Sequence, residues 1–313
     1  MATSTPKKIV LDIPPYLRAY DDGTVQRLLG TETTPPADPD PATGVSSKDV
    51  VLSPDSGVWA RLYRPAGPLP GRLPLVVYFH GGAFCISSAA DPVYHHMLNA
   101  FVREARVLLV SVDYRRAPES PLPAAYDDSW AALRWVAIRA DDWIRDSADL
   151  GRVFLAGDSA GANICHHMAM RAGPEGPGME IAGILLVHPY FWGEAAVGPE
   201  AESPAFKSVV DAWWRYVCPS EKGCDDPWIN PLVDGAPGLD GLSCGRVLVC
   251  VAGNDILRER GKMYYRALVD SGWAGKAQIH ETDGAAHVFH IIEPDSEDTK
   301  KLIQKCAEFV NGV

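Results

Sequence analysis

The stretch 155–168, LAGDSAGANICHHM, places Ser159 between Gly157 and Gly161. An apolar run precedes this stretch and a helix-forming run follows it, so the pattern predicts a sharp strand-to-helix turn with the serine at its apex. Such a turn strains the apex residue and brings the positions two residues to either side close together, and both positions therefore need glycine. The pattern indicates a nucleophilic serine; the alternative interpretation is a tight turn that contains an incidental serine.

A serine hydroxyl is a weak nucleophile until a base takes its proton, and His287 is the predicted base. It lies in the loop DGAAH that follows the strand-like run AQIHET, where it can reach back over a sheet. His290, three residues later, is expected in a helix or against the core, and His280 lies within the predicted strand.

The acid that would orient this base is predicted to be Asp255, directly after the strand-like run RVLVCVAG. A carboxylate there can hold the correct histidine tautomer and stabilise the imidazolium. The chain order serine, aspartate, histidine is the order of α/β-hydrolases. A helix N-cap is the alternative interpretation of Asp255, and Asp283 is the reserve candidate for the acid.

Catalysis of acyl transfer also needs N–H donors for the oxyanion, and the motif HGGAF after the run LPLVVYF is the predicted source. The backbone N–H groups of Gly81 and Gly82 are expected to point into the site. The N–H of Ala160, next to the serine, would be the third donor, and His80 would support the motif. An ordinary turn is the alternative interpretation of HGG.

Other polar residues have structural interpretations. His166 and His167 are expected to be packed side chains, and Asp158 is expected to hydrogen-bond neighbouring loops and support the turn at Ser159. Neither metal-ligand spacing nor a nucleotide-binding glycine motif is found, so the expectation is no metal and no cofactor. Tyr114 and Arg115 are likewise expected to be structural.

Strand-like runs alternate with helix-like runs along most of the chain, which predicts an α/β fold with a mostly parallel sheet and a hairpin near its start. Residues 31–45 read as a loop, residues 15–30 as one or two short helices, and residues 191–230 as an insertion without strands. We expect one α/β-hydrolase domain over 1–313, with helical cap elements at about 1–45 and 191–230. The expected strands are 49–54, 58–65, 73–80, 107–114, 152–157, 181–190, 246–253 and 277–282, and the expected helices are 93–105, 127–139, 162–172, 259–272 and 296–310.

Composition narrows the class of partner. The chain has 313 residues and a net charge of −11, which disfavours nucleic acid and anionic membrane surfaces. Seven cysteines without CxxC spacing indicate neither a disulfide framework nor a zinc site. The expected partner is a small-molecule ester, the expected state a monomer or weak homodimer, and the expected location the cytoplasm, with the nucleus as a second compartment.

Taken together, these motifs resemble the plant carboxylesterases of the hormone-sensitive-lipase-like group of α/β-hydrolases. The resemblance runs from about Ile9 to Val310 and implies the same triad, the same oxyanion motif and a cap over the site. It is carried by HGGAF, VDYRRAPESPLPAAYDD, GDSAGAN, DPWINPLVDGAP, DILRERG and HVFHI, in the family's order.

Two features qualify the resemblance. The family often has a third glycine where this chain has Ala83, whose methyl group is expected to narrow the acyl side of the pocket. The group also contains 2-hydroxyisoflavanone dehydratases, tuliposide-converting enzymes and gibberellin receptors, and the receptors lack the catalytic histidine. Because His287 is present, the resemblance implies a serine carboxylesterase for small, fairly apolar esters, with a dehydratase-like lyase and a hormone-binding protein as alternatives.

Overall fold

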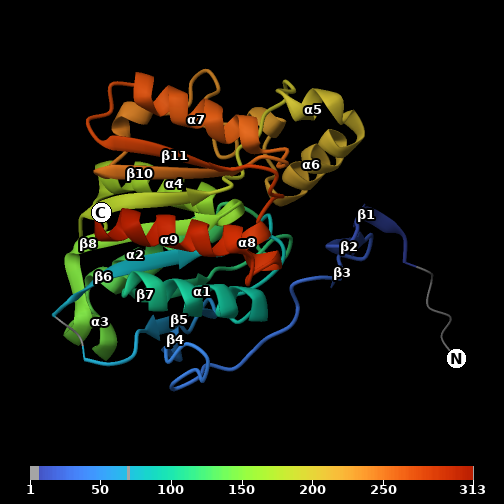
Figure 1. The fold of residues 1–313 in the computed structure, drawn as a ribbon. Helices are drawn as coiled ribbons and strands as arrows, with labels where there is room; N and C mark the ends of the chain where they lie inside the picture. Colours follow the sequence, from blue (N-terminus) through green and yellow to red (C-terminus); the bar gives the residue numbers. More distant parts are fainter. Residues whose placement is uncertain (1–6, 69–70, 313) are drawn as a thin grey trace, which may run out of the picture.

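The structure, a computed structural model, describes residues 7–68 and 71–312. Its central sheet has eight strands in the order β11-β10-β9-β8-β6-β7-β5-β4 (Figure 1). Neighbours from β7 to β11 run parallel, whereas β4 and β5 form an antiparallel hairpin at the edge. The mostly parallel sheet and the hairpin are as predicted. The strands are β4 (Ser46–Ser53), β5 (Val58–Arg64), β6 (Leu73–Phe79), β7 (Leu108–Asp113), β8 (Ala148–Asp158), β9 (Ile181–Val187), β10 (Arg246–Ala252) and β11 (Lys276–Thr282).

Helices cover both faces of this sheet, because its central strands are apolar on both sides. In β6, Val77 and Phe79 face one apolar core and Val76 and Tyr78 face the other, as the two-residue period of a strand requires. The first core contains side chains of α2, α3, α4 and α7, and the second contains those of α1, α8 and α9. The bounds are α1 (Pro92–Ala105), α2 (Ala124–Ala137), α3 (Asp142–Ser147), α4 (Ala160–Glu175), α7 (Arg258–Asp270), α8 (Phe289–Ile292) and α9 (Glu297–Asn311).

The N-terminal segment is a small antiparallel sheet, so the expectation of short helices over residues 15–30 is wrong. Its strands are β1 (Ile9–Ile13), β2 (Leu17–Tyr20) and β3 (Val25–Arg27). In β2, Leu17 and Ala19 are buried and alternate with more exposed neighbours, which is the two-residue period of a strand. A run of four residues is too short for this period to be recognised in the sequence. The first six residues of the expected cap segment 1–45 lie outside the described residues.

The insertion at 191–230 contains no strand among its described residues, as expected, and folds into α5 (Pro199–Glu202), α6 (Pro204–Val217) and the 3₁₀ turn Gly223–Asp225. A second 3₁₀ turn follows at Leu239–Gly241. A buried ion pair fastens the insertion to α7: Arg260 Nε donates to Glu200 Oε1 at 2.7 Å and Nη2 to Oε2 at 2.8 Å. Two parallel hydrogen bonds fix the geometry of such a pair as well as its charge.

The N-terminal sheet and α6 meet beside the loop that follows β6 (Figure 1). The rings of Tyr16 and Trp213 have centroids 5.2 Å apart. Trp213 Nε1 lies 3.3 Å from the Cys85 sulfur, and Arg27 Nε donates to the Cys85 carbonyl at 2.6 Å. Both segments thus contact the loop that carries HGGAF.

Over residues 7–68 and 71–312, no helix is long and apolar enough to cross a membrane.

Candidate active site

Ser159 occupies a strained turn between β8 and α4, with φ 51° and ψ −115°. The backbone is crowded around it. A Cβ on Gly157 would lie 2.6 Å from the Gly161 carbonyl oxygen, and a Cβ on Gly161 would collide with the Phe79 carbonyl group. The two glycines are therefore required by steric fit, which is the reason predicted for their spacing.

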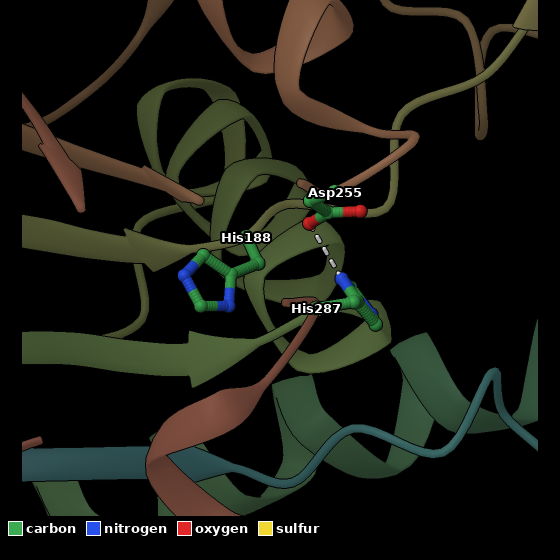
Figure 2. Close-up of side chains that lie close together, drawn as sticks. All are labelled: His188, Asp255 and His287. Carbon is green, nitrogen blue, oxygen red and sulfur yellow. Dashed lines mark hydrogen bonds and ion pairs between the residues drawn. The ribbon is translucent and has the colours of Figure 1, made fainter. Parts of the chain in front are cut away.

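His287 lies between Ser159 and Asp255, which come from the ends of different strands. Its Nδ1 is 2.7 Å from Asp255 Oδ2, the contact drawn in Figure 2, and its Nε2 is 3.1 Å from Ser159 Oγ. A carboxylate only accepts, so the proton is on Nδ1 and the lone pair of Nε2 faces the serine hydroxyl. The buried Asp255 also accepts the Leu257 N–H through Oδ1 at 2.9 Å, which fixes the orientation of the carboxylate.

The charge around His287 favours its protonated form. Burial lowers the pKa of this imidazole, but the Asp255 charge and hydrogen bond outweigh burial, and the pKa is raised from its ordinary value. Asp158 adds to the effect at longer range. A base of this kind accepts a proton readily from a hydroxyl and holds it as an imidazolium against the carboxylate.

The other histidine candidates lie elsewhere. His290 is buried in α8, and neither of its ring nitrogens has a hydrogen-bond partner within the described part of the chain. His280 lies on β11, as expected. The aspartate that His287 contacts is Asp255, not the reserve candidate Asp283.

The expected use of the Gly81 N–H as an oxyanion donor needs correction. That N–H donates to Asp158 Oδ1 at 3.1 Å and to the Tyr94 hydroxyl oxygen at 2.9 Å, so it is already engaged. Across the described residues, the N–H groups of Gly82 and Ala83 have no acceptor. The same holds for Ala160, which is the first residue of α4 and so has no partner inside the helix.

Asp158 anchors the HGGAF loop from beneath. Its carboxylate is buried and accepts the Tyr78 hydroxyl at 2.6 Å and the Tyr94 hydroxyl at 2.8 Å, in addition to the Gly81 N–H. Burial raises its pKa, while these hydrogen bonds act in the opposite direction. The expected hydrogen bonding of Asp158 to a neighbouring loop is therefore present, and the loop is the one that carries HGGAF.

His80 supports the same loop as a neutral, fully buried ring. It stacks on Tyr114 with centroids 4.4 Å apart, and its Nδ1–H donates to the Gly81 carbonyl at 2.8 Å. Burial, together with the charge of Arg116, lowers the pKa of His80 to about 3. The Tyr114 hydroxyl donates to the His80 carbonyl at 2.7 Å, a structural role as expected.

His166 and His167 are packed side chains. Nδ1 of His166 lies 3.0 Å from the Tyr264 hydroxyl, and Nε2–H of His167 donates to the Trp228 carbonyl at 2.9 Å. Neither contact involves a second metal-ligating residue. His166 is buried in α4 and His167 is half-buried there, about two helical turns beyond Ser159.

His188, Asp255 and His287 are close enough together for their ligand atoms to be considered for a metal ion. Each is already engaged, however. Asp255 and His287 share a hydrogen bond (Figure 2), and His188 Nδ1 accepts the backbone N–H of Val288 at 3.0 Å. A metal would have to replace these bonds, and the donor set fits the hydrogen-bonded arrangement better.

Sequence reasoning missed His188, which follows β9 directly. The signal was its place at the carboxyl end of a parallel strand, the edge at which ligand sites of such sheets lie. It also missed the engagement of the Gly81 N–H, which depends on Tyr94 from a separate helix and has no local sequence signal.

Comparisons with known proteins agree with this geometry. Residues 76–291 match a family described as alpha/beta hydrolase fold. A protein named "Probable carboxylesterase 2" from Arabidopsis thaliana is 53% identical over 99% of both chains. A protein named "2-hydroxyisoflavanone dehydratase" from Glycyrrhiza echinata is 44% identical over 99% of this chain and 98% of its own.

Among solved structures, a thermostable carboxylesterase cloned from a metagenomic library has a TM-score of 0.74 and 28% identity, covering 85% of this chain and 88% of its own. The chain belongs to the α/β-hydrolase family and, within it, to the group of plant carboxylesterases.

Proposed function

We propose that the protein is a serine carboxylesterase that hydrolyses small, fairly apolar carboxylic esters through an acyl-enzyme intermediate. The observation that carries the proposal is the position of His287, whose two ring nitrogens bridge Asp255 and Ser159 at hydrogen-bond distances. Membership of the carboxylesterase group supports the same reaction.

In the acylation step, Ser159 Oγ attacks the ester carbonyl carbon while its proton passes to His287 Nε2. The imidazolium is stabilised by Asp255, which stays ionised. His287 then protonates the departing alcohol, and the acyl group remains on the serine as an ester.

In the deacylation step, His287 takes a proton from water, which attacks the acyl carbon. Collapse of the second tetrahedral intermediate returns the proton to Ser159 Oγ and releases the carboxylic acid. The residues of the triad end the cycle as they began it, so no cofactor is consumed.

The oxyanion donors in this proposal are the N–H groups of Gly82, Ala83 and Ala160. The Gly81 peptide serves instead as the anchor that Asp158 holds. Each preorganised donor of this kind is typically worth about a hundred- to thousandfold in rate. Because the donors are backbone groups, the Ala83 methyl leaves them intact and acts only on the shape of the pocket.

The substrate class rests on the aromatic surroundings of the serine. The Tyr190 N–H donates to the Ser159 carbonyl at 3.0 Å, and the Tyr190 and Trp214 rings have centroids 6.3 Å apart. Trp214 belongs to α6 and also lies 6.3 Å from Phe84, next to Ala83 in the oxyanion loop. These rings are buried, so they form the apolar backing of the oxyanion loop. We propose that the insertion and the N-terminal sheet form the cap and that these apolar surroundings favour apolar acyl or alcohol groups.

A dehydratase is the second candidate, favoured by the relative from Glycyrrhiza echinata that carries that name. On the same site, His287 would abstract a proton and water would leave. Mixing the protein with a 2-hydroxyisoflavanone and analysing the product separates the two, since a loss of water is expected only of the lyase. A hormone-binding protein without turnover would bind tightly and hydrolyse nothing, which the bridging His287 argues against.

Three further properties belong to the proposal. A net charge of −11 supports a small-molecule partner rather than nucleic acid or an anionic membrane surface. All seven cysteines are free thiols, which supports the cytoplasm, with the nucleus as a second compartment. The solution state is proposed to be a monomer or a weak homodimer.

The test is turnover of short-chain p-nitrophenyl esters by the wild type and by Ser159→Ala. The wild type is expected to show saturable hydrolysis, and the variant to lose at least about a thousandfold in kcat. Retention of wild-type activity by a folded Ser159→Ala protein would show that the serine is not the nucleophile.

A further inference from the structure

His188 is a buried histidine at the carboxyl end of β9, beside the pair formed by Asp255 and His287 (Figure 2). Its backbone N–H donates to the Cys250 carbonyl at 2.8 Å, so the residue is fastened to the neighbouring strand β10. Its ring Nδ1 accepts the backbone N–H of Val288 at 3.0 Å. The His188 side chain therefore connects the carboxyl end of β9 to Val288, the residue that follows the base.

Val288 needs such a tie because of its backbone conformation. It has φ 49° and ψ 32°, in the left-handed region, where a β-branched residue is a genuine outlier. The turn at this residue lets His287 face Ser159 while Phe289, one residue later, enters the core. A strained turn persists only where surrounding contacts determine it.

The loop before the base is held by a different residue. Asn254 donates two hydrogen bonds to this loop: its backbone N–H donates to the Ala285 carbonyl at 2.8 Å, and its Nδ2 donates to the Gly284 carbonyl at 2.8 Å. His287 thus lies between a tether on its N-terminal side and the His188 bond on its C-terminal side. Loss of either tether would free the backbone that carries the imidazole.

The contribution of the His188 ring is its acceptor nitrogen, Nδ1, which accepts the Val288 N–H. Accepting the Val288 N–H leaves the ring proton on Nε2, which is buried and has no partner within the described chain. Such an unpaired group is costly, and an apolar residue of similar size would avoid that cost. The bond at Nδ1 is what the histidine gains in exchange.

The charges around this cluster keep the bond in place. Burial, then the neighbouring histidines, keep the pKa of His188 well below its usual range, so the ring stays neutral and Nδ1 keeps its lone pair. The titratable groups that act on or adjoin the base are Asp255, Asp158, His188 and His290. The two carboxylates favour the imidazolium of His287, whereas the two histidines are neutral neighbours.

We propose that His188 is a positioning residue for the base: through its bond to the Val288 N–H, it holds His287 at hydrogen-bond distance from both Ser159 and Asp255. The role rests on the proposed serine esterase mechanism. It is separate from the chemistry itself, because the His188 ring contacts the loop backbone and not the hydroxyl that reacts.

The test compares His188→Ala, His188→Asn and the control His290→Ala. Ala removes the acceptor; Asn places an amide oxygen near the position of Nδ1 and is expected to restore most of the function. His290 is equally buried, and its ring centroid lies 5.5 Å from that of His188, but it makes no hydrogen bond within the described chain. Its replacement therefore reproduces the lost volume without the lost tether.

Four quantities are measured: kcat and KM with p-nitrophenyl esters, the pH dependence of kcat/KM, and the pKa of the His287 imidazole by NMR. His188→Ala is expected to lower kcat about a hundredfold with little change in KM, the usual effect of misplacing a catalytic group. The pKa of His287 is expected to fall towards its ordinary value as its contact with Asp255 loosens, and the acid limb of the pH profile to move to lower pH. His290→Ala is expected to keep the wild-type pH profile.

The outcomes separate this inference from the proposed function. If the wild type hydrolyses no ester, the esterase proposal fails, while the NMR titration of His287 still tests the tether. If folded His188→Ala keeps the wild-type kcat and His287 pKa, or if His290→Ala shifts both as strongly, the positioning role is contradicted.

Discussion

Replacement of Asp158 tests how the oxyanion loop is held. In the structure its carboxylate accepts three donors: the Tyr78 and Tyr94 hydroxyls at 2.6 and 2.8 Å and the Gly81 N–H at 3.1 Å. Asp158→Ala removes all three contacts; the Gly81 N–H keeps its bond to the Tyr94 hydroxyl oxygen at 2.9 Å, whereas the two buried tyrosine hydroxyls lose their acceptor. At about 1 kcal/mol for each of these two groups, the free energy of unfolding should fall by roughly 2 kcal/mol.

The catalytic effect follows from the same contacts. Without Asp158, the Gly81 N–H loses one acceptor and the Tyr94 hydroxyl that remains to hold it is itself no longer fixed, so the N–H groups of Gly82 and Ala83 lose their fixed direction. The loss of one oxyanion donor costs about 2.7–4 kcal/mol in activation free energy, so kcat should fall about a hundred- to thousandfold while KM stays near its wild-type value. Asp158→Asn keeps one oxygen for Tyr78 and Gly81 and should lose about tenfold or less.

The assay pairs steady-state hydrolysis of a p-nitrophenyl ester with inhibition by a trifluoromethyl ketone, which forms a tetrahedral adduct on the serine. Across wild type, Asp158→Asn, Asp158→Ala and Tyr94→Phe, the logarithm of the inhibition constant should follow the logarithm of kcat/KM, because both depend on oxyanion binding. Chemical denaturation measures the stability of each variant. If folded Asp158→Ala loses stability but keeps kcat within about threefold of the wild type, the proposed link to the oxyanion donors is refuted.

Three further predictions concern the turn and the base. Gly161→Ala should abolish activity or folding because its Cβ would collide with the Phe79 carbonyl, whereas Gly173→Ala in the same helix meets its nearest atom at 3.6 Å and should be tolerated; activity and thermal denaturation of both variants check this. The raised pKa of His287 predicts that kcat/KM falls as pH drops through a value above about 6.5, since only the neutral ring can act as base. Asp255→Asn should lower kcat by about four orders of magnitude and move this acid limb to lower pH, and an unmoved limb would show that Asp255 does not set the pKa.

The predictable part of the fold is the part whose sequence signal is local. Apolar runs bounded by turn residues predicted the central strands such as β6 and β10, because a strand buried on both faces must be apolar throughout. Turn residues between two strand-like runs predicted the hairpin of β4 and β5. The N-terminal strands β1 to β3 were not predicted. These strands are only three to five residues long, and β1 is largely exposed although its sequence, IVLDI, is mostly apolar. Packing against α6 and the loop after β6 determines their conformation.

The part of the candidate site that could be predicted consists of the residues that directly follow strands recognisable in the sequence. Ser159, Asp255 and His287 each follow a recognisable strand, so their meeting above the sheet could be expected from the fold. The engagement of the Gly81 N–H and the contact of His188 with the loop could not. Both depend on the depth and direction of buried side chains from distant segments, which sequence spacing does not encode.

The most direct test of the central claim is covalent trapping of the nucleophile. The intact, active protein is treated with an organophosphate and digested, and the modified peptide is identified by mass spectrometry. The claim predicts one phosphoryl group per chain, on Ser159, with loss of esterase activity in the same proportion and no adduct on Ser159→Ala. Ester hydrolysis that persists with Ser159 unmodified, or an adduct on a different residue that accounts for the inhibition, would contradict it.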